Sequence, residues 1–241
     1  MYTVQDELQI GYNYSKMVEQ QINLYDDPFV NAYINGIGQR LVSSLHSKEI
    51  SYVFKVVDDP QINAFAIPGG YCYVNIGLIN FAETEEELAS VISHEIGHVV
   101  GRHGTEKMSK IGTFDLLISI FLGPNPSASS QLLTQLASEG LILNYGRRAE
   151  LEADKLGIEQ MYRSGINPDG AVVFFKRLQS KEKSDPTKLQ SLMSTHPKTK
   201  DRIINAEKII KSLPAKSNIS IDPSDISKIN QIKNYIKKNS K

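Results

Sequence analysis

The segment from Thr84 to Val99 constrains the fold of this 241-residue chain more than any other. Thr84 followed by Glu87 fits a capping box, in which two side chains satisfy backbone amides at a helix start. Apolar residues then recur at helical spacing, at Leu88, Val91, Ile92 and Val99. The pattern predicts a helix that begins after Thr84 and ends near residues 101–104.

Inside this helix lies the run His94-Glu95-Ile96-Gly97-His98. Two histidines at i and i+4 share one helical face, so both imidazoles can reach one metal ion. Glu95 projects to the side of that pair, where it can contact a metal-bound water without binding the metal. Two histidines and one carboxylate leave the fourth tetrahedral position open, as a hydrolytic zinc centre requires. The competing interpretation is a pair of solvent-facing histidines on an amphipathic helix.

A third ligand must come from elsewhere in the chain. Glu150 is the better candidate, because Glu150 and Asp154 stand at i and i+4 on one helix face while Glu152 points away. One carboxylate can then ligate while the other accepts a hydrogen bond from a ligand histidine. The competing interpretation is a charged, solvated helix face. His46 is expected in solvent, and His103, near the helix end, is expected to be a surface or capping residue.

Two further helices are predicted at residues 4–20 and 28–46, the second with Asp27 as its cap and Pro28 in its first turn. Alternating β-branched and aromatic residues predict strands at 50–57, 63–67 and 71–75, with a turn at 68–70. We expect these strands to form a small antiparallel sheet. Helices follow at about 146–164, 168–181 and 199–212, and residues 111–145 read as two helical pieces around a loop. The predicted fold is α+β, mostly α-helical.

Residues 1–213 are expected to form one domain, followed by a basic tail at 214–241. Isoleucines at helical spacing in the tail predict a docked amphipathic helix: Ile226, Ile229, Ile232 and Ile236.

Composition excludes several classes of protein. Lys+Arg and Asp+Glu are both 27, so no global positive field recruits nucleic acid, and we expect none as a partner. The single cysteine, Cys72, excludes an internal disulfide and a Cys-based zinc site, and its alternating neighbours predict a buried thiol in a strand. No stretch approaches the 18 apolar residues of a transmembrane helix. Asp6 and Glu7 stand where a signal peptide would need an apolar run.

Several motifs occur here in the order seen in family forty-eight of the metallopeptidases. These are His94–His98, Glu150-x-x-Ala153-Asp154, and the run Ser194-Thr195-His196-Pro197 followed by Arg202-Ile203. Residues 63–71 and 77–79 are also similar to that family's strand ahead of the zinc helix. The resemblance covers about residues 3–210 and is to a gluzincin group that includes CAAX prenyl proteases, HtpX-like and Oma-like proteases, and soluble BepA-like periplasmic proteases.

The resemblance implies a gluzincin-type catalytic domain with one zinc ion, held by His94, His98 and Glu150. Glu95 would be the general base that deprotonates the zinc-bound water, and Asp154 would orient a zinc histidine. The run Asn63, Ala64, Phe65 and Ala66 would be an edge strand that pairs with an extended peptide or unfolded protein.

His196 has two roles open in this group: oxyanion stabilisation, or a switch that occupies the open zinc position and keeps the enzyme latent. The competing interpretation is a loop histidine held by Pro197. Arg202 is expected to support that loop or to form a salt bridge, without a catalytic role. The apolar residues of 111–145 fit a core, a lid or a peripheral membrane contact.

The implied function is a zinc metalloendopeptidase acting on unfolded or damaged proteins. A second hypothesis is a zinc-stabilised, chaperone-like protein of the cell envelope that rarely cuts its clients, although a pure binder would not need Glu95 beside the metal. A structural zinc site is excluded by the ligand set, since such sites usually close the fourth position with Cys or His. Because the chain lacks the spanning helices of membrane-bound members, it resembles the soluble, exported branch, in the bacterial periplasm or cell envelope.

Overall fold

The computed structural model describes residues 2–111, 145–184, 186–189, Leu192, His196, 201–215 and 223–239. The two helical pieces predicted within 111–145 therefore fall almost wholly outside the described residues. The predicted class, a mostly helical α+β domain with a small sheet beside the histidine-bearing helix, is confirmed.

The first two helices begin at the caps their sequences provide. Helix α1 (Val4–Glu19) starts with a capping box in which Thr3 and Asp6 bond each other's backbone amides. Helix α2 (Pro28–Ser43) starts at Asp27, whose carboxylate accepts from the amides of Phe29 and Val30, as predicted.

Three short strands form the sheet: β1 (Val53–Val57), β2 (Ala64–Ile67) and β3 (Tyr71–Asn75). Their order is β1-β3-β2. The antiparallel expectation is confirmed for the β2–β3 hairpin, whose turn uses Gly69 and Gly70 at φ 82° and 90°. It is wrong for β1, which pairs in parallel with β3. Side-chain alternation specifies which face of a strand is buried, but not which neighbour lies alongside or in which direction.

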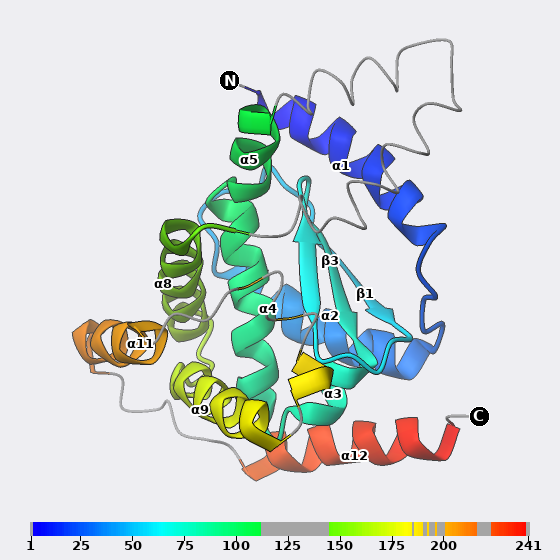
Figure 1. Cartoon of the computed structure of the whole chain (residues 1–241), viewed down its shortest axis with the longest axis vertical. Coiled ribbons are helices and arrows are strands. Elements are labelled where there is room, and N and C mark those ends of the chain that lie inside the picture. The colour runs from blue at the N-terminus through cyan, green and yellow to red at the C-terminus, as the bar shows by residue number, and fades with distance from the viewer. Residues whose placement is uncertain are drawn as a thin grey trace.

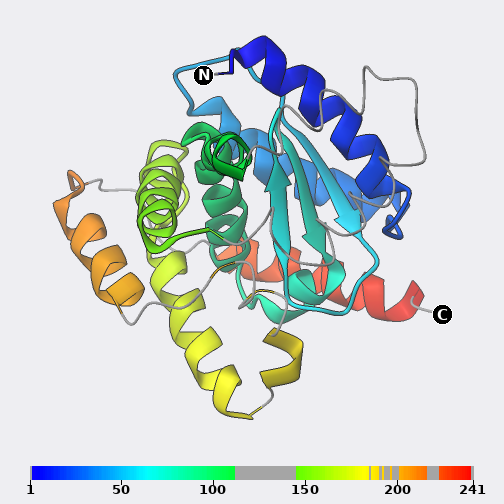
Figure 2. The same cartoon turned by 45° about the horizontal axis from the view of Figure 1, so that its top comes forward.

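The two faces of the sheet pack against different helices (Figures 1 and 2). Cys72 and Val74 of β3 point into the main core, which α2 and helix α4 (Glu85–Val100) also line. Tyr73 points to the opposite face, where Ile10 and Tyr14 of α1 cover it. Cys72 is a buried free thiol, as predicted. The sheet is thus enclosed on both sides.

Helix α4 runs through the middle of the molecule beside the sheet (Figure 1). Helix α3 (Ile76–Phe81) leads into it and helix α5 (His103–Ile111) follows it. Thr84 caps α4 through the amide of Glu87, as predicted. The Glu87 carboxylate, however, accepts from the amide of Glu83 and from Arg177, so the reciprocal half of the box is replaced by a salt bridge to another helix.

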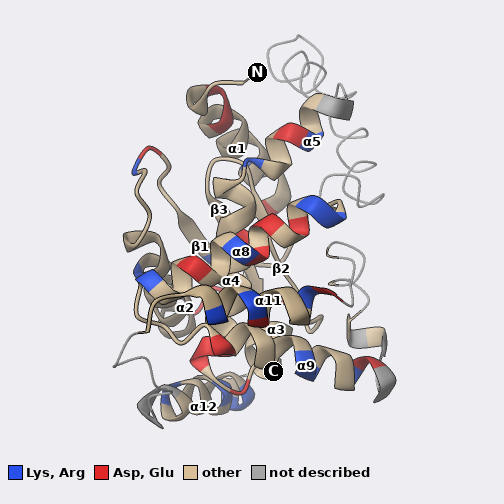
Figure 3. Cartoon of the chain, turned by 90° about the vertical axis from the view of Figure 1, so that its left-hand side faces the viewer, with Lys and Arg blue, Asp and Glu red and all other residues tan. Residues whose placement is uncertain are grey.

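The remaining elements are α8 (Arg147–Arg163), α9 (Asp169–Ser184), the short 3-10 turn η1 (Pro186–Leu189), α11 (Asp201–Ser212) and α12 (Pro223–Asn239). Helices α8, α9 and α12 pack against α4, and α11 packs on α8 and α9. Helix α12 lies along the bottom of the molecule in Figure 1 and buries Ile229, Ile232 and Ile236 in the main core, whereas Ile226 is exposed. Both basic and acidic residues lie along α8 in Figure 3. Among the described helices, none combines the length and apolar character needed to cross a membrane.

Helices α4 and α8 approach closely because each places a glycine at the contact. A Cβ on Gly97 would lie 2.7 Å from the carbonyl oxygen of Ala153, and a Cβ on Gly157 would lie 3.0 Å from the backbone nitrogen of His94. Real Cβ atoms essentially never lie 2.7 Å from a backbone oxygen. Any larger residue at position 97 must therefore push the two helices apart. This contact sets the position of everything that α8 directs toward α4.

We predict that Gly97→Ala lowers the free energy of unfolding by about 1–3 kcal/mol, because the added methyl group overpacks the α4–α8 contact. Urea or thermal denaturation of chelator-treated protein measures this separately from metal binding. Gly36→Ala is the matched control: Gly36 is an exposed residue of α2 and nothing lies within 4 Å of its Cβ position, so the change should be neutral or stabilising. Equal stability of Gly97→Ala and wild type would contradict the prediction.

Candidate metal centre

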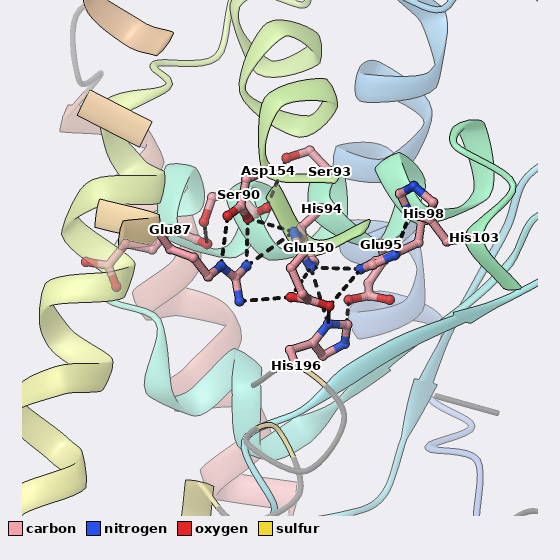
Figure 4. A network of polar contacts seen from close by, with 11 residues as sticks. Glu87, Ser90, Ser93, His94, Glu95, His98, His103, Glu150, Asp154 and His196 are labelled. Atoms are coloured by element: carbon pink, nitrogen blue, oxygen red, sulfur yellow. Dashed lines mark hydrogen bonds and ion pairs between the residues drawn. The ribbon is translucent and has the colours of Figure 1, made fainter. Parts of the chain in front are cut away.

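The three motif residues of α4 point into the interior of the protein. His94, Glu95 and His98 are 7%, 2% and 1% exposed. The interpretation of solvent-facing histidines is therefore wrong. Their side chains converge on one point between α4, α8 and the chain around His196 (Figure 4).

Glu150 of α8 completes a compact group with the two histidines. Its carboxylate oxygens lie 3.5 Å from Nε2 of His94 and 3.4 Å from Nε2 of His98, and the two Nε2 atoms are 3.0 Å apart. Glu150 is fully buried and Asp154 nearly so, whereas Glu152 is half exposed. The predicted division of this helix face is thus correct, and a solvated charged face is excluded at Glu150 and Asp154.

His196 joins the same group from a distant part of the chain. Its Nδ1 lies 3.0 Å from Oε1 of Glu150 and 3.3 Å from Nε2 of His94, and its Nε2 lies 3.3 Å from Oε1 of Glu95. Ligand atoms of His94, His98, Glu150 and His196 all lie within 4.8 Å of one another, and all four residues are buried. His196 is therefore a buried member of this group.

The donor set fits a zinc ion. Zinc bonds of about 2.0–2.1 Å in tetrahedral geometry place ligand atoms roughly 3.3 Å apart, close to the separations between the His94, His98 and Glu150 atoms. Oε2 of Glu150 and Oε1 of Glu95 are buried without a well-aligned hydrogen bond to described residues, and their nearest ion-pair neighbours are Nη1 of Arg202 at 3.0 Å and Nε2 of His196 at 3.3 Å. Buried carboxylate oxygens require well-aligned partners, which a divalent cation and its bound solvent would supply.

Asp154 and Arg202 support this group from behind His94. Oδ1 of Asp154 lies 2.9 Å from Nδ1 of His94, the nitrogen that faces away from Glu150. Arg202 donates to both Asp154 oxygens at 2.6 and 2.8 Å, and its Nη1 lies 3.0 Å from Oε2 of Glu150. The guanidinium also lies over the ring of Phe175, 4.6 Å from its centroid. Arg202 thus forms the expected salt bridge, and its partners belong to the metal centre.

Electrostatics hold Glu150 ionised. Burial alone would raise the pKa of Glu150, but hydrogen bonds from the surrounding imidazoles outweigh it and hold that pKa far below its usual value. Burial would likewise lower the pKa of His94, yet its hydrogen bonds to Asp154 and Glu150 raise it to about 9. Burial raises the pKa of Glu95, whose charged form it penalises. This favours Glu95 as an acceptor of a proton.

The sequence did not predict the two residues that contact His98 from outside the ligand group, His103 and Tyr145. His103 was expected to be a surface or capping residue and not a ligand; it lies outside the ligand group, but it is 4% exposed and its Nδ1 lies 2.9 Å from Nδ1 of His98. The buried ring of Tyr145 stacks on His98 at a centroid distance of 3.8 Å. Gly101 marks the end of α4, and its position two residues before His103 could have indicated that a new helix begins at His103. Nothing in the sequence distinguishes Tyr145. His46 is exposed, as expected.

The predicted peptide-binding run lies beside the centre. Ala64, Phe65 and Ala66 belong to edge strand β2, and Asn63 precedes it. The amide of Ala66 points away from β3 and donates to Oε2 of Glu95 at 3.0 Å, whereas the carbonyl of Asn63 accepts from Asn75 of β3. The outward edge of β2 therefore faces Glu95.

A helix that presents His-Glu-x-x-His, joined by a glutamate from a later helix, defines the metal-centre arrangement of zinc peptidases. Residues 28–210 match Peptidase family M48. The chain belongs to this family, a family of metalloendopeptidases, and the geometry of its metal site is intact.

Curated relatives agree with this assignment. The putative beta-barrel assembly-enhancing protease of Vibrio cholerae is 32% identical over 88% of this chain and 46% of its own length. The beta-barrel assembly-enhancing protease of Escherichia coli is 28% identical over 85% of this chain and 44% of its own length. The mitochondrial metalloendopeptidase OMA1 of Schizosaccharomyces pombe is 29% identical, with coverages of 78% and 55%. The chain thus spans about half the length of these relatives.

We predict that zinc at about 100 times its dissociation constant stabilises the folded protein by about 2.7 kcal/mol. For a chain of this size, the melting temperature should rise by about 5–10 °C. Glu150→Gln should abolish this shift, because it removes the charged ligand between the two histidines. Thermal denaturation with and without zinc measures it, with the exposed His46→Ala as the control that keeps the full shift. A full zinc shift in Glu150→Gln would exclude Glu150 from the site.

Proposed function

We propose that this chain is a zinc-dependent metalloendopeptidase that hydrolyses peptide bonds of unfolded or damaged proteins. One observation carries the proposal: the buried carboxylate of Glu95 lies between the metal-binding group and the outward edge of β2. A metal-binding site that only stabilised the fold would not need a buried carboxylate held beside it, outside the group of ligand atoms.

His94, His98 and Glu150 would hold the zinc ion. When bound, zinc polarises the scissile carbonyl and lowers the pKa of water. Glu95 takes the proton from the attacking water and passes it to the leaving amine, a transfer that its raised pKa favours. Asp154 accepts from Nδ1 of His94 and so keeps the Nε2 lone pair directed at the metal.

The substrate would bind as an extended strand along β2. The outward backbone groups of the strand can pair with a peptide, as in strand addition, and the Ala66 amide would join them once it releases Oε2 of Glu95. Backbone pairing of this kind requires an unfolded segment and reads little of its sequence. This supports unfolded proteins as the substrate class.

A cavity of about 340 Å³ adjoins the centre on the side of α9. Glu95 and His196 lie at one end of it, and its walls are mostly apolar, with Val91, Phe174, Leu178 and Leu192 among them. We propose that it receives a large apolar side chain of the substrate, because burial of such a side chain contributes about 1.5–3 kcal/mol.

His196 would keep the enzyme latent. Catalytic zinc sites hold three protein ligands and leave the fourth position to water or substrate. Nδ1 of His196 lies within the metal-binding group at hydrogen-bond distance from Glu150, where it would take that position. Opening of the site would then require His196 to move away.

We further propose an exported location, in the bacterial periplasm or cell envelope, and a role in protein quality control. The similarity to the beta-barrel assembly-enhancing proteases of Vibrio cholerae and Escherichia coli supports this.

Glu95→Gln should keep zinc and lose about 10²–10⁴-fold in peptidase turnover, because the amide cannot accept the proton. Casein cleavage with and without chelator, together with metal analysis of the same samples, tests this. The wild type should hold one zinc per chain and cleave in a chelator-sensitive manner. Wild-type turnover in Glu95→Gln would show that another group is the base. Zinc without cleavage in every variant would favour the chaperone-like function.

His196→Ala should raise casein cleavage, because it vacates the fourth position around the metal. If about 90% of molecules are closed by His196, the increase is about tenfold. Metal analysis controls for loss of zinc, which His94, His98 and Glu150 should retain. Unchanged or lower activity with zinc retained would contradict latency through His196 and leave it a role in catalysis or in support of the site.

A further inference from the structure

The two metal-centre histidines of α4, His94 and His98, have different partners at their Nδ1 atoms. Nδ1 of His94 faces the carboxylate of Asp154. Nδ1 of His98 instead faces Nδ1 of a third imidazole, that of His103, at 2.9 Å (Figure 4). Histidine ligands usually donate their second N–H to a carboxylate, a carbonyl or water, so an imidazole acceptor requires its own explanation.

One proton lies between the two Nδ1 atoms, and metal binding decides its position. Nε2 of His98 faces Glu150 and must offer a lone pair to the metal, so the proton of neutral His98 sits on Nδ1. Nδ1 of His103 must then accept it, which places the His103 proton on Nε2. That nitrogen lies 3.6 Å from the half-exposed carboxylate of Glu152 and makes no hydrogen bond to described residues. The arrangement is consistent with neutral imidazoles at both positions.

The backbone at the end of α4 is shaped to place His103 there. Arg102 adopts a left-handed φ of 54°, which interrupts the helix between the end of α4 at Val100 and the start of α5 at His103. The Arg102 side chain holds this turn through Glu7 of α1 at 2.7 Å. A Cβ on Gly101 would lie 2.6 Å from Nε2 of His103, so only glycine leaves room for the ring. The left-handed backbone of Arg102 and the absence of a side chain at Gly101 together hold the His103 ring beside His98.

One face of the His98 ring is also covered. Tyr145 stacks on it at 3.8 Å with an interplanar angle of 16°. The stack restricts the tilt of the imidazole, and the bond to His103 restricts its rotation. Together they leave Nε2 directed at Glu150.

We infer that His103 is a positioning residue for the metal centre: by accepting the Nδ1 proton of His98, it fixes the tautomer and orientation in which His98 binds the metal. The inference rests on the proposed zinc site, but not on peptidase activity. His103 itself does not enter the ligand group, whose members are His94, His98, Glu150 and His196.

Zinc affinity measured by competition with a chromophoric chelator tests the inference. His103→Leu removes the acceptor at similar volume and should weaken zinc binding about 10–100-fold. His103→Asn keeps an acceptor oxygen near the position of Nδ1 and should remain within about threefold of wild type. His46→Leu, at the exposed histidine, should bind as wild type does. A His103→Leu affinity within twofold of wild type, or equal losses in the Leu and Asn variants, would assign His103 a packing role and overturn the inference.

A second measurement needs no variant and so stands even where His103→Leu does not fold. Nitrogen-15 NMR of the histidine rings in zinc-loaded wild type should find the proton of His98 on Nδ1 and that of His103 on Nε2. A proton on Nδ1 of His103 would overturn the inference. Failure of wild type to bind zinc at all would instead overturn the proposed function, so the two failures are distinguishable.

Discussion

The metal centre depends on how closely two helices approach. Gly97 of α4 and Gly157 of α8 let the backbones meet where a Cβ on Gly97 would lie 2.7 Å from a carbonyl oxygen. Only at this separation do the short carboxylate side chains of Glu150 and Asp154 reach the histidines of α4. The geometry of the metal-binding group is therefore a consequence of backbone packing. Gly97, which has no functional group, contributes to that geometry by letting the two helices approach.

Charge balance explains why so many ionisable groups are tolerated in one buried place. Glu95, Glu150 and Asp154 are each at most 4% exposed, and ionised carboxylates in such surroundings are costly unless paired. Arg202 offsets one of these charges directly. A divalent cation would offset the other two, so the interior would be neutral with metal bound. The metal ion and Arg202 would thus share the neutralisation of the three buried carboxylates.

Much of the fold could be predicted from local patterns, and the misses have physical causes that such patterns do not show. Helix starts at Thr84 and Asp27 depend on a side chain and an amide three residues away, and both were correct. Spacing alone also placed Glu150 and Asp154 on the buried side of α8. The direction of β1, the burial of His103 and the stacking of Tyr145 were not predicted. The direction of β1 and the stacking of Tyr145 depend on contacts between segments far apart in the sequence. The burial of His103 depends on the left-handed backbone at Arg102, which no local pattern marks.

The order of strands in the sheet has a consequence for recognition. Had the three strands formed a simple meander, β2 would have been the central strand, with both of its edges hydrogen-bonded within the protein. Because β3 inserts between β1 and β2, the second strand is displaced to the rim, and its outward amide at Ala66 meets Glu95. The same strand order that replaces one antiparallel pairing by a parallel one leaves the outward edge of β2 beside Glu95, which accepts the Ala66 amide. The extended peptide that we propose as substrate would add a fourth strand there without displacing a strand of the protein, and its backbone would replace Glu95 as the partner of the Ala66 amide.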